Sequence, residues 1–221
     1  MNKLLVELSK ALTEVIVSNC KGKNSILLTM SGGMDTRLIL SIMLRNGITP
    51  DLMTWDGSPN DIKIASKIAK KEGLKQIIVH RKTSDTDWLD EVNKVILDYD
   101  VVFYGELMSE VFNKFVRFTE SERKLNDIID NYFQWVEDNS DNHDRELNKM
   151  VFPCLDKKVM NIAERIPIFF RVYGYINRKI IEHNYPYLMK YPHTVVNMRY
   201  RLLEFLYWCF VPMIERWGVY E

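Results

Sequence analysis

The sequence predicts an α/β fold in which a parallel twisted sheet is flanked by helices and followed by a helical C-terminal half. Over the first hundred residues, short apolar segments alternate with segments of helical periodicity. This spacing is typical of right-handed crossovers between parallel strands. A glycine-rich turn also separates the first apolar segment from the next helix, an arrangement typical of ligand-binding strand–helix junctions.

The chain begins with a predicted amphipathic helix at residues 4–17, where apolar residues recur at three- and four-residue spacing. A strand is expected at residues 25–30, because the segment is short and apolar and ends at the glycine-rich turn. The apolar segment 37–45 predicts a second helix, which Asn46-Gly47 ends.

The same alternation continues through three further strands and two helices. They are predicted at residues 51–55 (strand), 61–71 (helix), 76–79 (strand), 87–97 (helix) and 101–104 (strand). A turn rich in Asp, Gly, Ser and Pro leads into the first of these helices, and Gly73 stops it. Gly105 follows the last strand at once.

After Gly105 the sequence predicts helices and no further strand. We therefore expect one domain over residues 1–221, with an α/β part at 1–115 and a helical part at 116–221. Its length of 221 residues and hydrophobic fraction of 47% suffice for one substantial core. The aromatic C-terminal stretch is expected to form core or an oligomer surface, which leaves a homo-oligomer open.

Composition excludes several classes of function. Lys+Arg and Asp+Glu balance at 30 each, so broad nucleic-acid binding is not expected. The three cysteines form no Cys-x-x-Cys pair and the four histidines show no paired metal spacing, which argues against a zinc site. We find no secretion signal and no apolar run long enough to span a bilayer, so a cytoplasmic protein without membrane contact is expected.

The turn Ser31-Gly32-Gly33-Met34-Asp35-Thr36 has the chemistry of an anion site. Its glycines let backbone N–H groups approach an oxyanion, and the following helix directs its positive end to the same place. Ser31 and Thr36 add hydroxyl donors. Asp35 would repel a bare phosphate, so it fits best as a ligand of phosphate-bound Mg²⁺. The structural alternative is a surface turn in which Asp35 only complements the helix dipole.

This turn is neither a Walker loop nor a dinucleotide fingerprint, because the required Lys and Gly spacings are absent. It resembles the pyrophosphate-binding loop (PP-loop) of the ATP pyrophosphatase superfamily, whose members cleave ATP between the α- and β-phosphates. The resemblance implies that ATP is a substrate and that a carboxylate or carbonyl is activated as its adenylate.

Three later segments resemble the synthetase domain of the asparagine synthetase family, in the same order and spacing. They are Phe103-Tyr104-Gly105-Glu106-Leu107-Met108-Ser109-Glu110-Val111-Phe112, Val151-Phe152-Pro153-Cys154-Leu155-Asp156-Lys157-Lys158-Val159 and Ile176-Asn177-Arg178-Lys179-Ile180-Ile181-Glu182. The resemblance spans nearly the whole chain and implies an adenine nucleotide α-hydrolase-like fold. Asp156 is expected to act as a helix N-cap, whatever its role in the family.

The resemblance also implies a set of site residues. ATP would contact Ser31, Gly32, Gly33, Met34, Asp35, Thr36 and Gly105, with its adenine beside Thr54 and Trp55. Mg²⁺ would be held by Asp35, Glu106 and Glu110. Glu106, Lys179 and Arg178 are the candidate catalytic residues.

The sequence departs from the family pattern at defined positions. Position 2 is Asn, where the family's glutaminase half has its nucleophilic cysteine, so no glutaminase is expected here. Leu107 replaces a glycine and Ser109 replaces a metal-binding aspartate. The family's catalytic lysine falls on Gly174, and Lys179 or Arg178 would have to substitute for it.

Three functions follow as hypotheses. The first is an ATP-dependent, AMP-forming ligase that adenylates a small-molecule or peptide carboxylate and forms an amide. Free ammonia, another amine or a separate glutaminase or partner subunit would supply the nitrogen. The second is a non-catalytic ATP-binding or partner module, which the departures motivate. The third is a PP-loop enzyme that modifies tRNA, against which the neutral charge and the sparse cysteines count.

Overall fold

The protein is built on a five-stranded, all-parallel sheet with strand order β3-β2-β1-β4-β5. The computed structural model describes residues 3–80, 94–105, 108–112, 149–167, 170–171, 173–192, 206–210 and 212. The strands are β1 (Ile26–Thr29), β2 (Asp51–Trp55), β3 (Gln76–Val79), β4 (Val101–Phe103) and β5 (Met150–Val151). The predicted α/β class and parallel sheet are confirmed.

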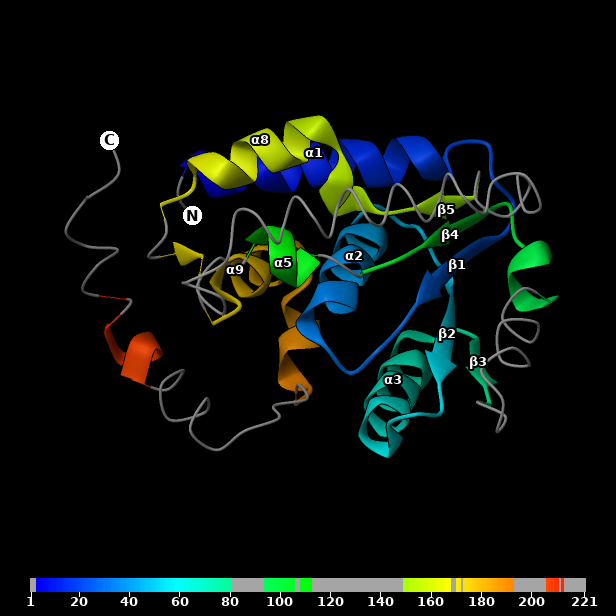
Figure 1. Ribbon diagram of the computed structural model, residues 1–221. Helices are drawn as coiled ribbons and strands as arrows, with labels where there is room; N and C mark the ends of the chain where they lie inside the picture. The colour runs from blue at the N-terminus through cyan, green and yellow to red at the C-terminus, as the bar shows by residue number, and fades with distance from the viewer. Residues whose placement is uncertain are drawn as a thin grey trace.

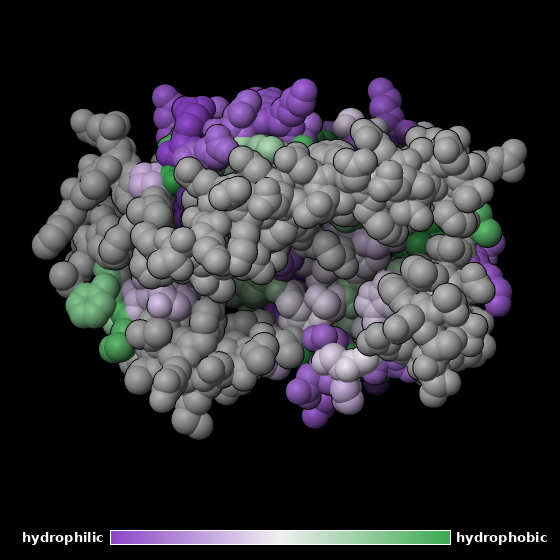
Figure 2. All heavy atoms as spheres, in the orientation of Figure 1, coloured by the Kyte–Doolittle hydropathy of each residue, from purple (hydrophilic) through white to green (hydrophobic). Residues whose placement is uncertain are grey.

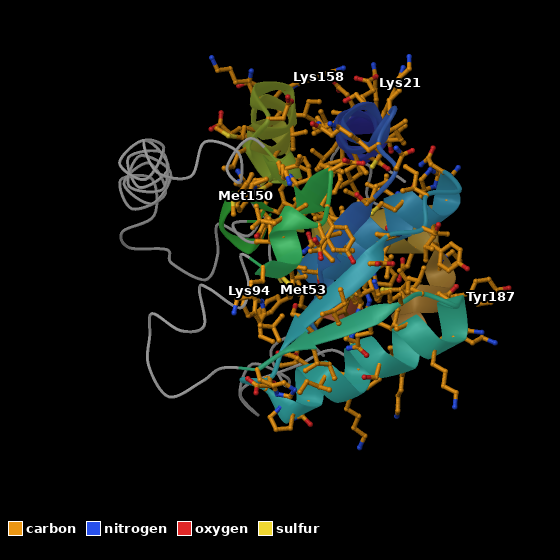
Figure 3. The ribbon with its side chains drawn as sticks, turned by 90° about the vertical axis from the view of Figure 1, so that its right-hand side faces the viewer. Lys21, Met53, Lys94, Met150, Lys158 and Tyr187 are labelled. Atoms are coloured by element: carbon orange, nitrogen blue, oxygen red, sulfur yellow. The ribbon has the colours of Figure 1, made fainter. Side chains whose placement is uncertain are left out.

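The chain reverses its direction across the sheet after β3. From β1 it moves outward through β2 to β3, and it then returns to place β4 on the other side of β1. Figure 3 labels Met53 on β2 and Met150 on β5, two strands that lie on opposite sides of the β1–β4 pair. Open α/β sheets bind ligands at such a switch point, beyond the carboxyl ends of the strands.

One face of the sheet carries the main hydrophobic core. Leu28, Leu52 and Phe103 point into it from the central strands, and five helices contribute buried side chains to it. These helices are α1 (Lys3–Cys20), α2 (Met34–Arg45), α3 (Pro59–Glu72), α8 (Lys157–Arg165) and α9 (Tyr175–Asn184). The short elements α5 (Met108–Phe112), η2 (Pro153–Leu155) and η4 (Pro186–Lys190) also add to this core.

The opposite face carries a smaller core. Leu27, Met53 and Val102 alternate with the residues of the main core along their strands and pack with Ile96 and Tyr99. Ile96 lies in a short helical stretch, residues 94–97, that leads into β4. Helical structure thus covers both faces, as parallel sheets require.

The N-terminal helix is joined to the C-terminal part. α1 and α8 lie side by side (Figure 1). Glu7 on α1 forms an ion pair of 3.2 Å with Arg165 on α8. Glu14 forms a second pair with Lys158, which lies on the same side of the molecule as Lys21 (Figure 3). Hydrophilic side chains gather over these two helices (Figure 2). The two predicted parts of the chain therefore share one core.

The structure corrects the predicted elements in two places. The expectation of no strand after Gly105 was wrong, because β5 pairs Met150 with Val102 and Val151 with Phe103. Two residues are too short for a periodic signal, and this strand exists only through its pairing with β4. The second helix begins at Met34 instead of residue 37, so Asp35 and Thr36 belong to its first turn.

Other expectations were confirmed or lie outside the described part of the chain. Asp156 caps α8, accepting from the N–H groups of Lys158 and Val159 at 2.9 and 3.1 Å. The expected helices over 87–97 and beyond Val111 fall largely outside the described residues. Within those residues, no helix combines the length and apolar character that a membrane crossing requires.

Candidate functional site

The predicted anion-binding turn lies at the switch point of the sheet. It connects the carboxyl end of β1 to α2, whose N-cap is Gly33 with extended backbone (φ −78°, ψ 173°). β4, the neighbour of β1 on the other side of the reversal, ends beside the same turn at Gly105. The first turn of a 12-residue helix therefore opens at the edge where this fold binds ligands.

The hydroxyl groups of the turn organise its backbone. Ser31 Oγ accepts from the Gly33 N–H at 3.1 Å and lies 3.3 Å from Thr36 Oγ1. Thr36 Oγ1 also accepts from the Ser31 N–H at 3.3 Å. The two hydroxyls predicted as ligand donors thus lie next to each other, on the turn that they shape.

A carboxylate occupies one backbone donor of the turn. Asp61 Oδ1 accepts from the Gly32 N–H at 2.9 Å. Asp61 is fixed at the start of α3, where its own N–H donates to the N-cap Ser58 at 3.3 Å. The Gly32 N–H is therefore engaged by a carboxylate of the protein itself, and a ligand anion would have to replace Asp61 there.

Gly105 lies against the start of α2 more closely than any side chain would allow. A Cβ at this position would be 2.9 Å from Thr36 N and 2.7 Å from Thr36 Cγ2. Real Cβ atoms do not approach backbone this closely, so a larger residue would push the β4 loop away from the turn. The structure thus brings together Gly105 and the 31–36 turn, two segments predicted to share a ligand.

Arg37 binds carbonyl groups of the turn and of the segment 188–192, and it was not predicted as a site residue. Its side chain is 0% exposed and donates to the carbonyls of Gly32 and Tyr191, each at 2.8 Å. It also donates to the carbonyls of Leu188 and Pro192. Burial lowers the pKa of Arg37 to about 10, so the guanidinium stays charged at neutral pH. An arginine directly before the apolar residues Leu38, Ile39 and Leu40 was the available signal.

Asn177 is a second residue that the sequence analysis missed. It lies on α9, is fully buried, and donates from Nδ2 to Asp35 Oδ1. Its own Oδ1 has no hydrogen-bond partner among the described residues. An amide side chain in the segment 176–182, which resembles a segment of the asparagine synthetase family, was the available signal.

The neighbouring candidates Arg178 and Lys179 contact aromatic rings. The Arg178 guanidinium lies 4.4 Å from the ring centre of Trp208, and its Nε is 3.7 Å from Glu182. Lys179 Nζ lies 5.5 Å from the ring centre of Tyr175. Gly174, the position of the family's lysine, has a left-handed backbone (φ 65°) and caps α9. The catalytic role of Arg178 and Lys179 stays a prediction.

Thr54 and Trp55 end β2 at the same edge of the sheet. Thr54 is buried and its Oγ1 accepts from Gln76 Nε2 at 3.0 Å. Trp55 is half-buried and packs against the smaller core. Their place beside an adenine stays a prediction.

The predicted metal ligands are partly described. Glu106 and Leu107 lie outside the described residues, as do the side chains of Ser109 and Glu110. Across the described part of the chain, no three His, Cys, Asp or Glu side chains gather as a metal site. The oxygen atoms that fit a hard cation there are the Asp35 carboxylate and the adjoining Asn177 Oδ1. Gly105 packs against the same first turn of α2.

No protein-family model matches this chain, and a search of curated proteins found no match. The functional interpretation therefore depends on the geometry of the turn and on the residues that surround it.

Proposed function

We propose that this chain binds ATP with Mg²⁺ at the 31–36 turn and acts as an ATP-dependent, AMP-forming ligase of the asparagine synthetase type. One observation carries the proposal: the turn lies at the switch point of the sheet, with Gly105 packed against Thr36. The strand order 3-2-1-4-5, with the turn after its central strand, also supports an adenine nucleotide α-hydrolase-like fold. The cytoplasm is the proposed compartment.

The residues of the turn would bind pyrophosphate oxygens by position and charge. The Gly32 and Gly33 N–H groups donate to Asp61 and to Ser31 Oγ in this structure, so a pyrophosphate oxygen would replace these acceptors. The start of α2 adds the positive end of a helix dipole. Arg37 adds a buried positive charge behind the same turn. Asp35 would hold Mg²⁺, which when bound neutralises charge on the leaving pyrophosphate. Preorganised donors of this kind are a major source of rate acceleration.

The test is a product assay. Full-length protein is incubated with ATP, Mg²⁺, candidate carboxylates and ammonia, and released pyrophosphate and AMP are measured. We expect both products in equal amounts with the correct carboxylate, and at least a hundredfold less with Asp35→Ala. Equal activity of Asp35→Ala and wild type would refute the proposed mechanism.

A second candidate function is ATP binding without turnover. The environment of the helical part favours it: Gly174 has no side chain, and Arg178 and Lys179 contact aromatic rings. Binding of ATP measured by calorimetry, with no AMP under any acceptor, would support this candidate. Any AMP release that depends on Asp35 would eliminate it.

A further inference from the structure

The amide of Asn177 lies beside the carboxylate to which the proposed function assigns the cation. Asn177 stands in the first turn of α9, and α9 packs along α2. Its Nδ2 donates to Asp35 Oδ1, so the two side chains join the helical part of the chain to the first turn of α2. The side chain is 0% exposed.

The other end of the same amide is unsatisfied. Asn177 Oδ1 is buried and accepts no hydrogen bond from the described residues. Burying an unpaired carbonyl oxygen costs free energy, so such atoms usually receive a donor from an ordered water or a ligand. Nδ2 and Oδ1 are bonded to the same carbon, so this acceptor lies within one amide group of the Asp35 carboxylate.

The assignment of the two amide atoms follows from the contact itself. If Oδ1 faced Asp35, two acceptors would meet without a proton between them, so Nδ2 is the atom that faces the carboxylate. Asn184 on the same helix provides a comparison, because the protein supplies both acceptors of its Nδ2 group. It is half-buried, and its Nδ2 donates to Ser9 Oγ at 3.0 Å and to the Ile180 carbonyl at 2.9 Å.

We propose that Asn177 is a positioning residue for a hydrated divalent cation at Asp35: Nδ2 orients the carboxylate, and Oδ1 accepts a hydrogen bond from a water molecule of the cation's hydration shell. This inference rests on the proposed function and adds to it a residue outside the 31–36 turn. Mg²⁺ usually retains several waters in protein sites. Partners that orient a metal ligand typically change metal affinity ten- to a hundredfold when they are removed.

The experiment measures binding and not turnover. Inorganic pyrophosphate is titrated into the full-length protein by calorimetry, with and without Mg²⁺, and the ratio of the two affinities is the Mg²⁺ coupling. We expect Asn177→Leu, which is close to Asn in size, to lower this coupling by ten- to a hundredfold. Asn184→Leu is the matched control on α9 and should leave the coupling within about twofold.

Asn177→Asp tests the same idea in the opposite direction. Without Mg²⁺ a second carboxylate repels Asp35 and pyrophosphate, so binding weakens. With Mg²⁺ the added oxygen attracts the cation, so the coupling rises above that of the wild type. A purely structural role for Asn177 predicts an unchanged coupling in every variant that folds.

The outcomes separate this inference from the proposed function. If the wild type binds no pyrophosphate with or without Mg²⁺, the proposed function fails and this inference falls with it. If the wild type binds and folded Asn177→Leu keeps its Mg²⁺ coupling, this inference alone is overturned. Should Asn177→Leu fail to fold, Asn177→Asp decides: a raised coupling supports the inference, and an unchanged or lowered one overturns it.

Discussion

The two ends of the parallel sheet use the same residue types in different ways. At the amino end, Asp100 Oδ2 accepts from the N–H groups of Asn24 and Ser25 at 2.8 and 3.1 Å. Asp51 Oδ2 accepts from Tyr99 Oη at 2.6 Å and from Lys75 Nζ at 3.0 Å. At the carboxyl end, carboxylates and amides surround a glycine-rich turn instead.

The difference lies in how completely the polar atoms are satisfied. At the amino end the protein supplies the partners, and burial together with the bond to Asp51 raises the pKa of Tyr99 to about 12. At the carboxyl end, Arg37 Nε and Asn177 Oδ1 are buried without a partner among the described residues. Satisfied polar groups stabilise the fold, whereas a buried polar atom without a partner can receive one from an ordered water or a ligand.

The largest effect is expected from removing Arg37. Arg37→Met would leave the buried carbonyls of Gly32 and Leu188, and the partly buried carbonyls of Tyr191 and Pro192, without this donor. We expect the free energy of unfolding to fall by about 3–5 kcal/mol, because a buried carbonyl that loses its donor costs about 1–3 kcal/mol. Urea denaturation followed by circular dichroism measures it.

Arg165→Met is the matched control for Arg37→Met. Arg165 pairs with Glu7 on the surface, and its side chain is 60% exposed. Exposed ion pairs contribute about 0–1 kcal/mol, so this variant should unfold close to the wild type. Equal losses in the two arginine variants would contradict the anchoring role of Arg37.

Substituting Gly105 should break the contact between β4 and α2. A Cβ would meet the Thr36 backbone at 2.9 Å, so Gly105→Ala should destabilise the protein by about 1–3 kcal/mol through overpacking. It should also weaken pyrophosphate binding, because the turn must shift. Gly57→Ala is the control, since a Cβ there meets no described heavy atom within 4 Å. Thermal unfolding of both variants decides whether the approach at Gly105 is constrained.

The sheet and its switch point could be predicted because their signals are local. β1 to β4 are apolar segments of three to five residues with helical periodicity between most of them, and Gly32-Gly33 marks the turn. β5 could not be predicted, because Met150 and Val151 become a strand only through β4. The start of α2 was predicted at residue 37 instead of Met34, because the glycine before the first turn and the polar residues within it are also typical of a loop.

The site was predictable where one segment provides it and not where distant segments meet. The 31–36 turn is visible in the sequence, but the Gly32–Asp61 contact spans 29 residues. The Asp35–Asn177 contact spans 142 residues, and nothing local to Asn177 predicts its partner. Long-range contacts of this kind depend on the packing of α3 and α9, which periodicity does not specify.

Neutralising Asp61 tests whether its carboxylate competes with a bound anion at the carboxyl end of the sheet. Asp61→Asn keeps an oxygen acceptor for the Gly32 N–H and removes one negative charge from the proposed anion site. A charge at about 4 Å in water contributes about 1 kcal/mol. We therefore expect inorganic pyrophosphate to bind about fivefold more tightly without Mg²⁺.

The same substitution at the other end of the sheet is the control for Asp61. Asp51→Asn removes a carboxylate that lies at the amino end, and it should leave pyrophosphate affinity unchanged. Calorimetric titration of the two variants compares the ends directly. Weaker binding by Asp61→Asn would mean that Asp61 assists the anion instead of competing with it.

The smallest effect, a pH dependence, is expected at Asp100. Hydrogen bonds from the backbone of Asn24 and Ser25 hold the pKa of Asp100 below its usual value. A carboxylate with a lowered folded-state pKa stabilises the protein above its unfolded pKa of about 3.9, and this contribution is lost as the pH falls through the folded value. Asp100→Asn should therefore be less stable than wild type at pH 7, and the difference in the free energy of unfolding should narrow below about pH 4.

Urea denaturation across this pH range measures the difference between the two proteins. A difference that stays constant with pH would show that the charge of Asp100 contributes nothing. Pyrophosphate binding at pH 7 should not change, because every partner of Asp100 named here lies at the amino end of the sheet.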